Sequence, residues 1–289
     1  MDFIVTLVNG LSLGGIYAMI ALGYTMVYGI AKMLNFAHGD IIMVGGYTIL
    51  VFLSINPILA IVASVAICVL LGMTVEKLAY KPLRGASPLA VLITAIGVSY
   101  LLQSLAQISF GTAAKFVPIM GDLGNISIGP ITISVATVIT LASTVVIMAA
   151  LSIFVKFTKT GRAMIAVSED KDASRLMGIN INFIITVTFA IGSALAALAG
   201  LFTLLRVPTI TPTFGALPGI KAFTAAVIGG IGSIPGAMLG GILLGIVECI
   251  CNSVPEIAPY TIAIEFAILI VILLVKPTGI LGKKRREKV

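Results

Sequence analysis

Histidine and cysteine, the side chains best suited to metal binding and nucleophilic chemistry, are scarce in this sequence. His38 is the only histidine, which excludes a histidine-rich metal site. The three cysteines, Cys68, Cys249 and Cys251, all lie in apolar runs. Residues two positions apart point in different directions on a helix, so Cys249 and Cys251 do not form a pair there. We interpret all three cysteines as small packing residues and expect no metal site.

Three polar side chains, Asn35, His38 and Asp40, interrupt an otherwise apolar region near the N-terminus. Asn and Asp are favoured N-cap residues. One interpretation is therefore that Asn35 or Asp40 caps the following helix while His38 forms a hydrogen bond nearby. The other interpretation is that these residues line or gate a path through the protein.

Glu248 and Glu265 are isolated carboxylates within the last two apolar stretches of the chain. A charge at the centre of a bilayer costs about 2.5–3.5 kcal/mol on insertion scales, and such residues usually face the interior of a helix bundle. We expect each carboxylate either to line a path or to form an ion pair inside the bundle. Proton-coupled transport would need such groups. The sequence offers only two unpartnered carboxylates and one histidine, which is weak evidence for proton coupling.

Glycines are concentrated between residues 229 and 245. Gly232, Gly236 and Gly240 recur every four residues, which predicts a flat helix face for close contact with another helix. The glycines that we assign to helix packing are Gly229, Gly230, Gly232, Gly236 and Gly240. A phosphate-binding loop is rejected because no strand is expected before this segment and no Gly-Lys-Ser/Thr sequence occurs. We therefore expect no ATP site of the Walker A type and no enzymatic activity in this chain.

The elements that carry these residues are predicted to be membrane-spanning helices. Hydrophobic residues make up 59% of the 289 residues and charged residues only 10%, compared with roughly 25% charged residues in soluble domains. A helix needs about 20 apolar residues to cross a hydrocarbon core about 30 Å thick. The apolar stretches predict spans at 4–30, 41–53, 58–75, 89–110, 131–155, 181–205, 223–232, 237–254 and 260–275. The second and seventh are short and could be broken or re-entrant, so we predict an all-α polytopic transmembrane bundle of eight or nine spans.

The distribution of basic residues predicts the orientation. With nine spans, all but three of the 18 Lys and Arg residues fall on one side, the exceptions being Lys115, Arg206 and Lys221. We expect Lys221 to lie near a membrane interface. Because cytoplasmic loops are enriched in Lys and Arg, we expect the N-terminus outside and the C-terminus in the cytoplasm. The net charge of +7 then reflects topology and contact with anionic membrane lipid, and we expect no nucleic-acid binding.

The polar segment 156–180 lies on the predicted cytoplasmic side. Its charges cluster between apolar residues such as Met164 and Leu176, which predicts one or two short helices at the membrane face that end at Gly178. It is either a solvated interfacial loop or a docking element whose apolar side chains enter a groove in a partner. From Asp172 to Gly178 it resembles the Glu-Ala-Ala-x-x-x-Gly loop of ABC importer permeases, with two of the four motif positions substituted.

Three stretches resemble the permease subunits of high-affinity branched-chain amino acid ABC importers. The first includes Asn9-Gly10-Leu11-Ser12-Leu13-Gly14, the segment from Ala21 to Ile30, and Asn35-Phe36-Ala37-His38-Gly39. The second is the loop from Gly161 to Asn180, and the third runs from Ala226 to Ala237 through Gly229-Gly230-Ile231-Gly232-Ser233-Ile234-Pro235-Gly236. The resemblance extends from about Asn9 to Gly279.

The resemblance implies a type II-like ABC importer permease of the bacterial inner membrane that works by alternating access. It implies a homologous second permease in a heterodimer, two cytoplasmic ATPase subunits, and a periplasmic or lipid-anchored substrate-binding protein. ATP and Mg would be bound by the ATPase subunits, so no cofactor is expected in this chain. Residues 1–289 would form one transmembrane domain, with an ATPase-docking loop at 156–180 and a basic cytoplasmic tail at 282–289. The docking residues that the resemblance implies are Arg162, Glu169, Asp170, Asp172, Ala173 and Gly178.

Three other functions compete with this one. Urea and short-amide importers use related permeases, so the resemblance leaves the substrate open between these and aliphatic amino acids. A stand-alone secondary carrier would often show repeat halves and ion-binding groups near the midplane, and no convincing repeat is present. An intramembrane enzyme would need a catalytic pair, a carboxylate dyad or a metal cluster, and the sequence places none.

Overall fold

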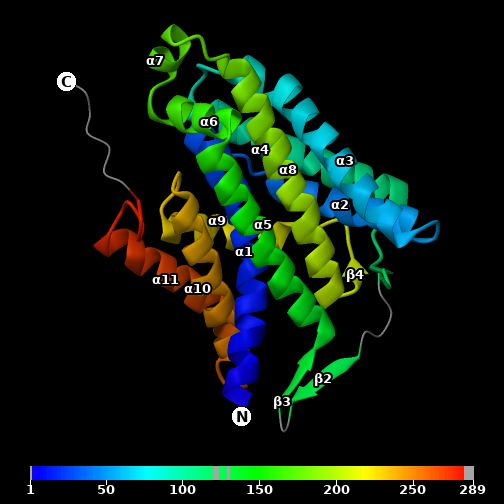
Figure 1. Cartoon of the computed structure of the whole chain (residues 1–289). Helices are drawn as coiled ribbons and strands as arrows, with labels where there is room; N and C mark the ends of the chain where they lie inside the picture. Colours follow the sequence, from blue (N-terminus) through cyan, green and yellow to red (C-terminus); the bar gives the residue numbers. More distant parts are fainter. Residues whose placement is uncertain (1, 120–123, 129–130, 283–289) are drawn as a thin grey trace.

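A computed structural model of the chain describes residues 2–119, 124–128 and 131–282. It is a helical bundle with α6 and α7 at one end and the β2–β3 hairpin and the N-terminus at the other (Figure 1). The helices are α1 (Asp2–Ala31), α2 (His38–Leu53), α3 (Pro57–Val75), α4 (Pro88–Phe110), α5 (Val135–Phe157), α6 (Lys159–Glu169), α7 (Lys171–Leu176), α8 (Ile181–Arg206), α9 (Ala216–Gly229), α10 (Ile234–Ser253) and α11 (Thr261–Val275). A π-helical turn, η1 (Glu76–Tyr80), extends α3.

Among the described residues, seven helical stretches are long and apolar enough to cross a membrane. The second and seventh predicted spans correspond to α2 and α9, which have 16 and 14 residues. At 1.5 Å per residue these helices are about 24 and 21 Å long, which is less than the hydrocarbon thickness of about 30 Å. The prediction of eight or nine complete spans is therefore not confirmed, although the all-α bundle is.

The fifth predicted span begins later than expected. Residues 131–134 form strand β3 (Ile131–Ser134), which pairs antiparallel with β2 (Asn125–Ile128). Isoleucine and threonine favour strands because their branched side chains pack well on a pleated surface. A second antiparallel pair joins β1 (Lys115–Phe116) to β4 (Thr209–Ile210), so the connection after α4 is fastened to the segment that follows α8.

The sequence encodes the starts of four long helices. Their N-cap residues accept hydrogen bonds from backbone N–H groups in the first turn, which satisfies donors that the helix cannot pair itself. The caps are Asn56 of α3, Ser87 of α4, Asn180 of α8 and Ser233 of α10. Proline occupies the first turn of α3, α4 and α10, where its missing N–H costs nothing.

The core of the bundle is built around α1 and α8. Helix α1 packs against α5, α8, α9 and α10, and α8 also contacts α2 and α3. Buried residues make up 67% of the apolar stretch of α8, but only 17% of that of α4 and 11% of that of α11. Helices α4 and α11 therefore present most of their apolar surface to the outside of the chain.

Close packing of α10 uses two glycine faces. Gly236 and Gly240 face α9, where a Cβ at either position would collide with backbone atoms. Gly241 and Gly245 face α1 in the same way, at Ala18 and Gly14.

The remaining glycines of the predicted stripe are placed elsewhere. Gly232 lies before the first residue of α10 and has a φ of +94°, so it is not part of the helix face that the four-residue spacing predicted. Gly230 ends α9 with a φ of +108°, while Gly229 is the last residue of α9 and contacts Gly236.

Candidate functional site

Helices α6 and α7 form the polar segment at one end of the bundle. The side-chain oxygen of Thr158 accepts a hydrogen bond from the N–H of Gly161 at 2.9 Å and begins α6. Asp170 begins α7, because its Oδ1 accepts hydrogen bonds of 3.0 Å from the N–H groups of Asp172 and Ala173. The segment ends at Gly178, which adopts a φ of +80°, a conformation that favours glycine.

The two faces of this segment differ in what they contact. Met164 and Val167 of α6 are buried against the bundle, whereas Leu176 and Met177 are 89% and 83% exposed. The predicted docking residues Arg162, Glu169, Asp172, Ala173 and Gly178 are all exposed. Asp170 is partly buried, and its carboxylate caps α7. The segment thus combines exposed charges with two large exposed apolar side chains.

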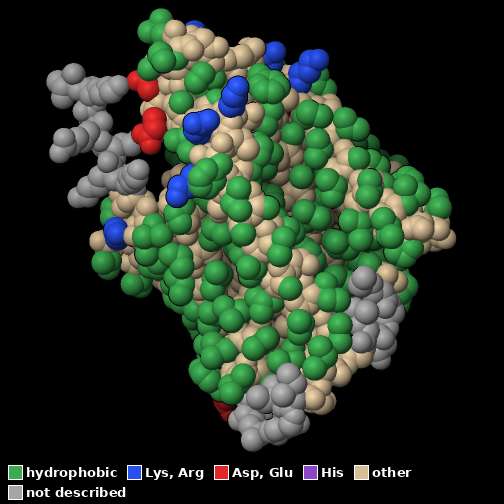
Figure 2. Space-filling view, viewed as in Figure 1, with side chains coloured by type: hydrophobic (Ala, Val, Ile, Leu, Met, Phe, Trp, Pro, Cys, Tyr) green, Lys and Arg blue, Asp and Glu red, His purple; other side chains and the backbone are tan. Residues whose placement is uncertain are grey.

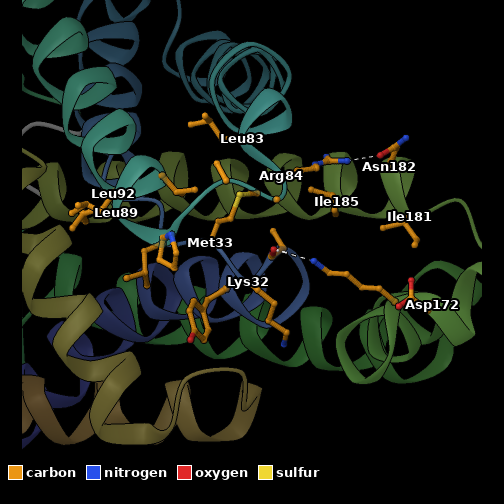
Figure 3. Close-up of a pocket in the computed structure, with 18 of the residues that line it drawn as sticks. Lys32, Met33, Leu83, Arg84, Leu89, Leu92, Asp172, Ile181, Asn182 and Ile185 are labelled. Carbon is orange, nitrogen blue, oxygen red and sulfur yellow. Dashed lines mark hydrogen bonds between the residues drawn. The ribbon is translucent and has the colours of Figure 1, made fainter.

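Helix α7 is attached to the end of α1 and borders a pocket. The ammonium group of Lys171 donates a hydrogen bond of 3.1 Å to the carbonyl oxygen of Ala31. The adjacent pocket has a volume of about 750 Å³ and is lined by residues from α1, α4, α7, α8 and the turn before α4 (Figure 3). Arg84 from that turn bonds Asn182 of α8 and forms an ion pair with the buried carboxylate of Glu76.

The Glu76 contacts were not anticipated from the sequence. Its second carboxylate oxygen accepts a hydrogen bond of 2.9 Å from Thr186 of α8. Glu76 therefore joins the end of α3 to α8. The available signal was a single carboxylate at the end of an apolar stretch with an arginine in the following turn.

Asn35, His38 and Asp40 are all buried and make separate contacts. Ala37 occupies the N-cap position of α2 and no side chain caps it, so the prediction that Asn35 or Asp40 caps this helix is wrong. Asn35 instead accepts a hydrogen bond of 2.8 Å from the hydroxyl of Tyr80, and Asp40 accepts one of 2.9 Å from Gln103 of α4. Burial makes these carbonyl and carboxylate oxygens pair with side chains of neighbouring helices.

His38 occupies the space between α1 and α8. Its ring lies 4.8 Å from the ring of Tyr24, edge to face. A Cβ at Gly23 would collide with this ring, so the glycine makes room for the histidine. Within the described part of the chain, His38 Nε2 has no hydrogen-bond partner.

The two carboxylates of the last helices are not isolated. The ammonium group of Lys221 in α9 lies 2.8 Å from Glu248 Oε1 and 3.3 Å from Glu265 Oε1. The hydroxyl of Tyr17 in α1 donates a hydrogen bond of 2.7 Å to Glu248 Oε2. Lys221 is buried, so the structure places it in an ion cluster that joins α1, α9, α10 and α11. The sequence carries a signal for this pairing, because one lysine and two carboxylates of opposite charge occur in otherwise apolar helices.

The described residues offer limited chemistry. No group of three or more His, Cys, Asp or Glu side chains among them could hold a metal ion. All three cysteines are free. Among the described residues, the carboxylates of Glu76, Glu248 and Glu265 form ion pairs, whereas the buried carboxylate of Asp40 accepts a hydrogen bond from Gln103. The polar segment α6–α7 is set apart from the bundle by its exposed charges and exposed apolar side chains.

Comparison with known proteins identifies the family. Residues 6–273 match the family described as the permease component of branched-chain amino acid transport systems. The high-affinity branched-chain amino acid transport permease BraD of Pseudomonas aeruginosa is 43% identical, over 98% of this chain and 97% of that protein. The corresponding permease LivH of Escherichia coli K12 is 40% identical, over 99% of this chain and 98% of that protein.

The fold is also found in a solved structure. A chain of an ABC transporter of the metal-chelate type, in an inward-facing conformation, matches with a TM-score of 0.52 at 15% identity, over 94% of this chain and 87% of that one. At this identity the similarity concerns the fold alone. The apolar helices together with the permease relatives make the chain a multi-pass protein of the inner membrane. It belongs to the family of permease components of branched-chain amino acid transport systems.

Proposed function

We propose that this chain is the membrane-spanning permease subunit of an ABC importer that carries branched-chain amino acids into the cytoplasm. The observation that carries the proposal is the similarity to the permeases BraD and LivH over nearly the whole length of all three chains. Similarity to sugar permeases is weaker, since the fructose import permease FrcC of Rhizobium meliloti matches over 31% of this chain. BraD and LivH are both branched-chain amino acid permeases, so branched-chain amino acids are favoured over the urea or short-amide alternative.

The chain would work with partners that supply energy and recognition. Two ATPase subunits would bind ATP and Mg, and a periplasmic or lipid-anchored binding protein would deliver the amino acid. A homologous second permease would complete the path. The low burial of α4 and α11 within the chain supports pairing with a second permease, because the apolar faces of these helices are available to another membrane subunit or to lipid.

The α6–α7 end would face the cytoplasm and dock the ATPase subunits. Figure 2 shows Lys and Arg side chains gathered toward this end on the visible face, which agrees with the enrichment of cytoplasmic loops in basic residues. Leu176 and Met177 would enter a groove of the ATPase, and Arg162, Glu169 and Asp172 would set the register. Because Lys171 ties α7 to the end of α1, movement of the docking helices would reach the central helix of the bundle.

Reconstitution tests this proposal. The chain is assembled in lipid vesicles with the second permease, both ATPase subunits and the binding protein, and uptake of labelled leucine and urea is measured with and without ATP. We expect ATP-dependent uptake of leucine and faster ATP hydrolysis with loaded binding protein. Accumulation of leucine by this chain alone, in vesicles without ATPases, would instead identify a secondary carrier.

Two substitutions test the docking segment. Gly178→Pro is incompatible with the φ of +80° at this position, and Asp172→Arg reverses an exposed charge on α7. Both variants should insert normally but lose the coupling between ATP hydrolysis and uptake. Glu256→Arg, a charge reversal at an exposed residue outside this segment, is the matched control. Normal uptake by both docking variants would remove the docking hypothesis.

A further inference from the structure

The pocket beside α7 is strongly cationic. Its volume is about 750 Å³, and four basic side chains line it: Lys32, Arg84, Lys171 and Arg175. Asp172 is its acidic lining residue, and Glu76 is paired with Arg84. Four positive charges therefore face two negative ones, so the pocket keeps an excess of positive charge.

The basic groups come from different elements and are held in place. Figure 3 shows Arg84 reaching from the turn before α4 toward Asn182, and Lys32 at the end of α1. Lys32 bonds the carbonyl oxygen of Gly29, and Lys171 bonds that of Ala31. Burial and the nearby guanidinium of Arg84 lower the pKa of Lys171, while Asp172 acts in the opposite direction. An anion between these groups would offset the repulsion between the two cations.

The rim of the pocket changes from charged to apolar on the side of α4. Leu89 and Leu92 line the pocket there, and Leu89 is 63% exposed. The apolar surface continues along α4 through Ile93 and Ile96, which are 60% and 43% exposed. The pocket thus lies at the start of α4. The basic side chains gather at this end of the helix, and an apolar strip runs along the exposed side of the helix.

We propose that this pocket binds the phosphate headgroup of an anionic phospholipid, whose acyl chains lie along the exposed face of α4. Basic pockets between transmembrane helices at the cytoplasmic end are suited to such headgroups. A free phosphate ion would use the cations but not the apolar strip, whereas a lipid uses both. The bound lipid would connect the ends of α1, α4 and α8 to α7. This inference rests on the cytoplasmic position proposed for the α6–α7 end and does not depend on the transported substrate.

Lipid titration of the purified full chain tests the proposal. Native mass spectrometry measures the binding of cardiolipin, phosphatidylglycerol and phosphatidylcholine, with inorganic phosphate as a separate competitor. Lys171→Gln with Arg175→Gln should weaken binding of the two anionic lipids about 30-fold, as expected for two basic side chains at a lipid surface. Lys77→Gln with Lys81→Gln removes two exposed charges from η1 and the residue that follows it, outside the pocket, and should change binding less than about threefold.

A third variant separates lipid from free phosphate. Leu89→Gln alters an exposed side chain, so it should fold normally and weaken lipid binding without changing any binding of phosphate. Equal lipid binding by the Lys171/Arg175 variant and the Lys77/Lys81 variant would overturn the proposal. Complete displacement of the lipid by millimolar inorganic phosphate, with no effect of Leu89→Gln, would also overturn it and assign the pocket to a free phosphate ion.

Discussion

The substitution Lys221→Met removes the ammonium group that contacts both Glu248 and Glu265. Methionine has a similar length and fits an apolar helix, so the change removes charge more than volume. Two carboxylates from neighbouring helices are then left close together without the cation that separates them. The Glu265 side chain is only 1% exposed, so water cannot replace the lost partner.

The expected cost follows from burial. Removing one partner of a buried ion pair destabilises a protein by about 3–5 kcal/mol, and we expect Lys221→Met to fall in this range. Glu265→Gln should cost about 1 kcal/mol, the size of one hydrogen bond, because Lys221 and Glu248 remain paired at 2.8 Å. The double variant Lys221→Met/Glu265→Gln should be at least about 1 kcal/mol more stable than Lys221→Met alone, because one of the two buried negative charges has been removed.

The loss of stability in Lys221→Met should be concentrated in α11. Thr261 and Glu265 are the buried residues of this helix, so the ion cluster is a major part of its attachment. Unfolding by a denaturing detergent measures the overall free energy, and hydrogen exchange of residues 261–275 measures the local opening. Lys77→Met, at an exposed lysine, is the matched control and should stay within about 0.5 kcal/mol of the parent chain.

Two results would refute this reasoning. A cost below about 1 kcal/mol for Lys221→Met would mean that the buried carboxylates do not need the lysine. Equal costs for Lys221→Met and Glu265→Gln would mean that side-chain shape, rather than the balance of charge, holds these helices together.

Three further substitutions test local features. Asp170→Ala removes the N-cap of α7 and should cost about 1 kcal/mol, seen as faster amide exchange in α7; unchanged exchange would contradict it. Gly236→Leu collides with α9 and should lower the yield of folded protein in size-exclusion chromatography far more than Leu243→Ile at a 44% exposed site; equal yields would count against close packing there. Tyr80→Phe leaves Asn35 Oδ1 without its 2.8 Å hydrogen bond and should cost about 1–3 kcal/mol in detergent unfolding; a neutral result would imply that another donor replaces it.

The apolar stretches alone located the long helices, because lipid requires each crossing segment to be long, apolar and internally hydrogen-bonded. A local signal placed one boundary as well. Gly178 ends the α6–α7 segment, as the sequence predicts. The strand from Ile131 to Ser134 was missed because its four residues continue the apolar run of α5.

The sequence by itself thus determined a multi-spanning helical permease with one polar segment at the end of the bundle. The tertiary structure decided which buried polar groups meet. Lys221 and Glu265 are 44 residues apart, Asn35 and Tyr80 45, and Asp40 and Gln103 63. A helix that is apolar on all sides does not indicate in its sequence which face is buried. The pairing therefore depends on how the helices are rotated and packed against each other. The same packing brings Lys32, directly after α1, together with the basic residues of α7 and of the turn before α4 around one pocket.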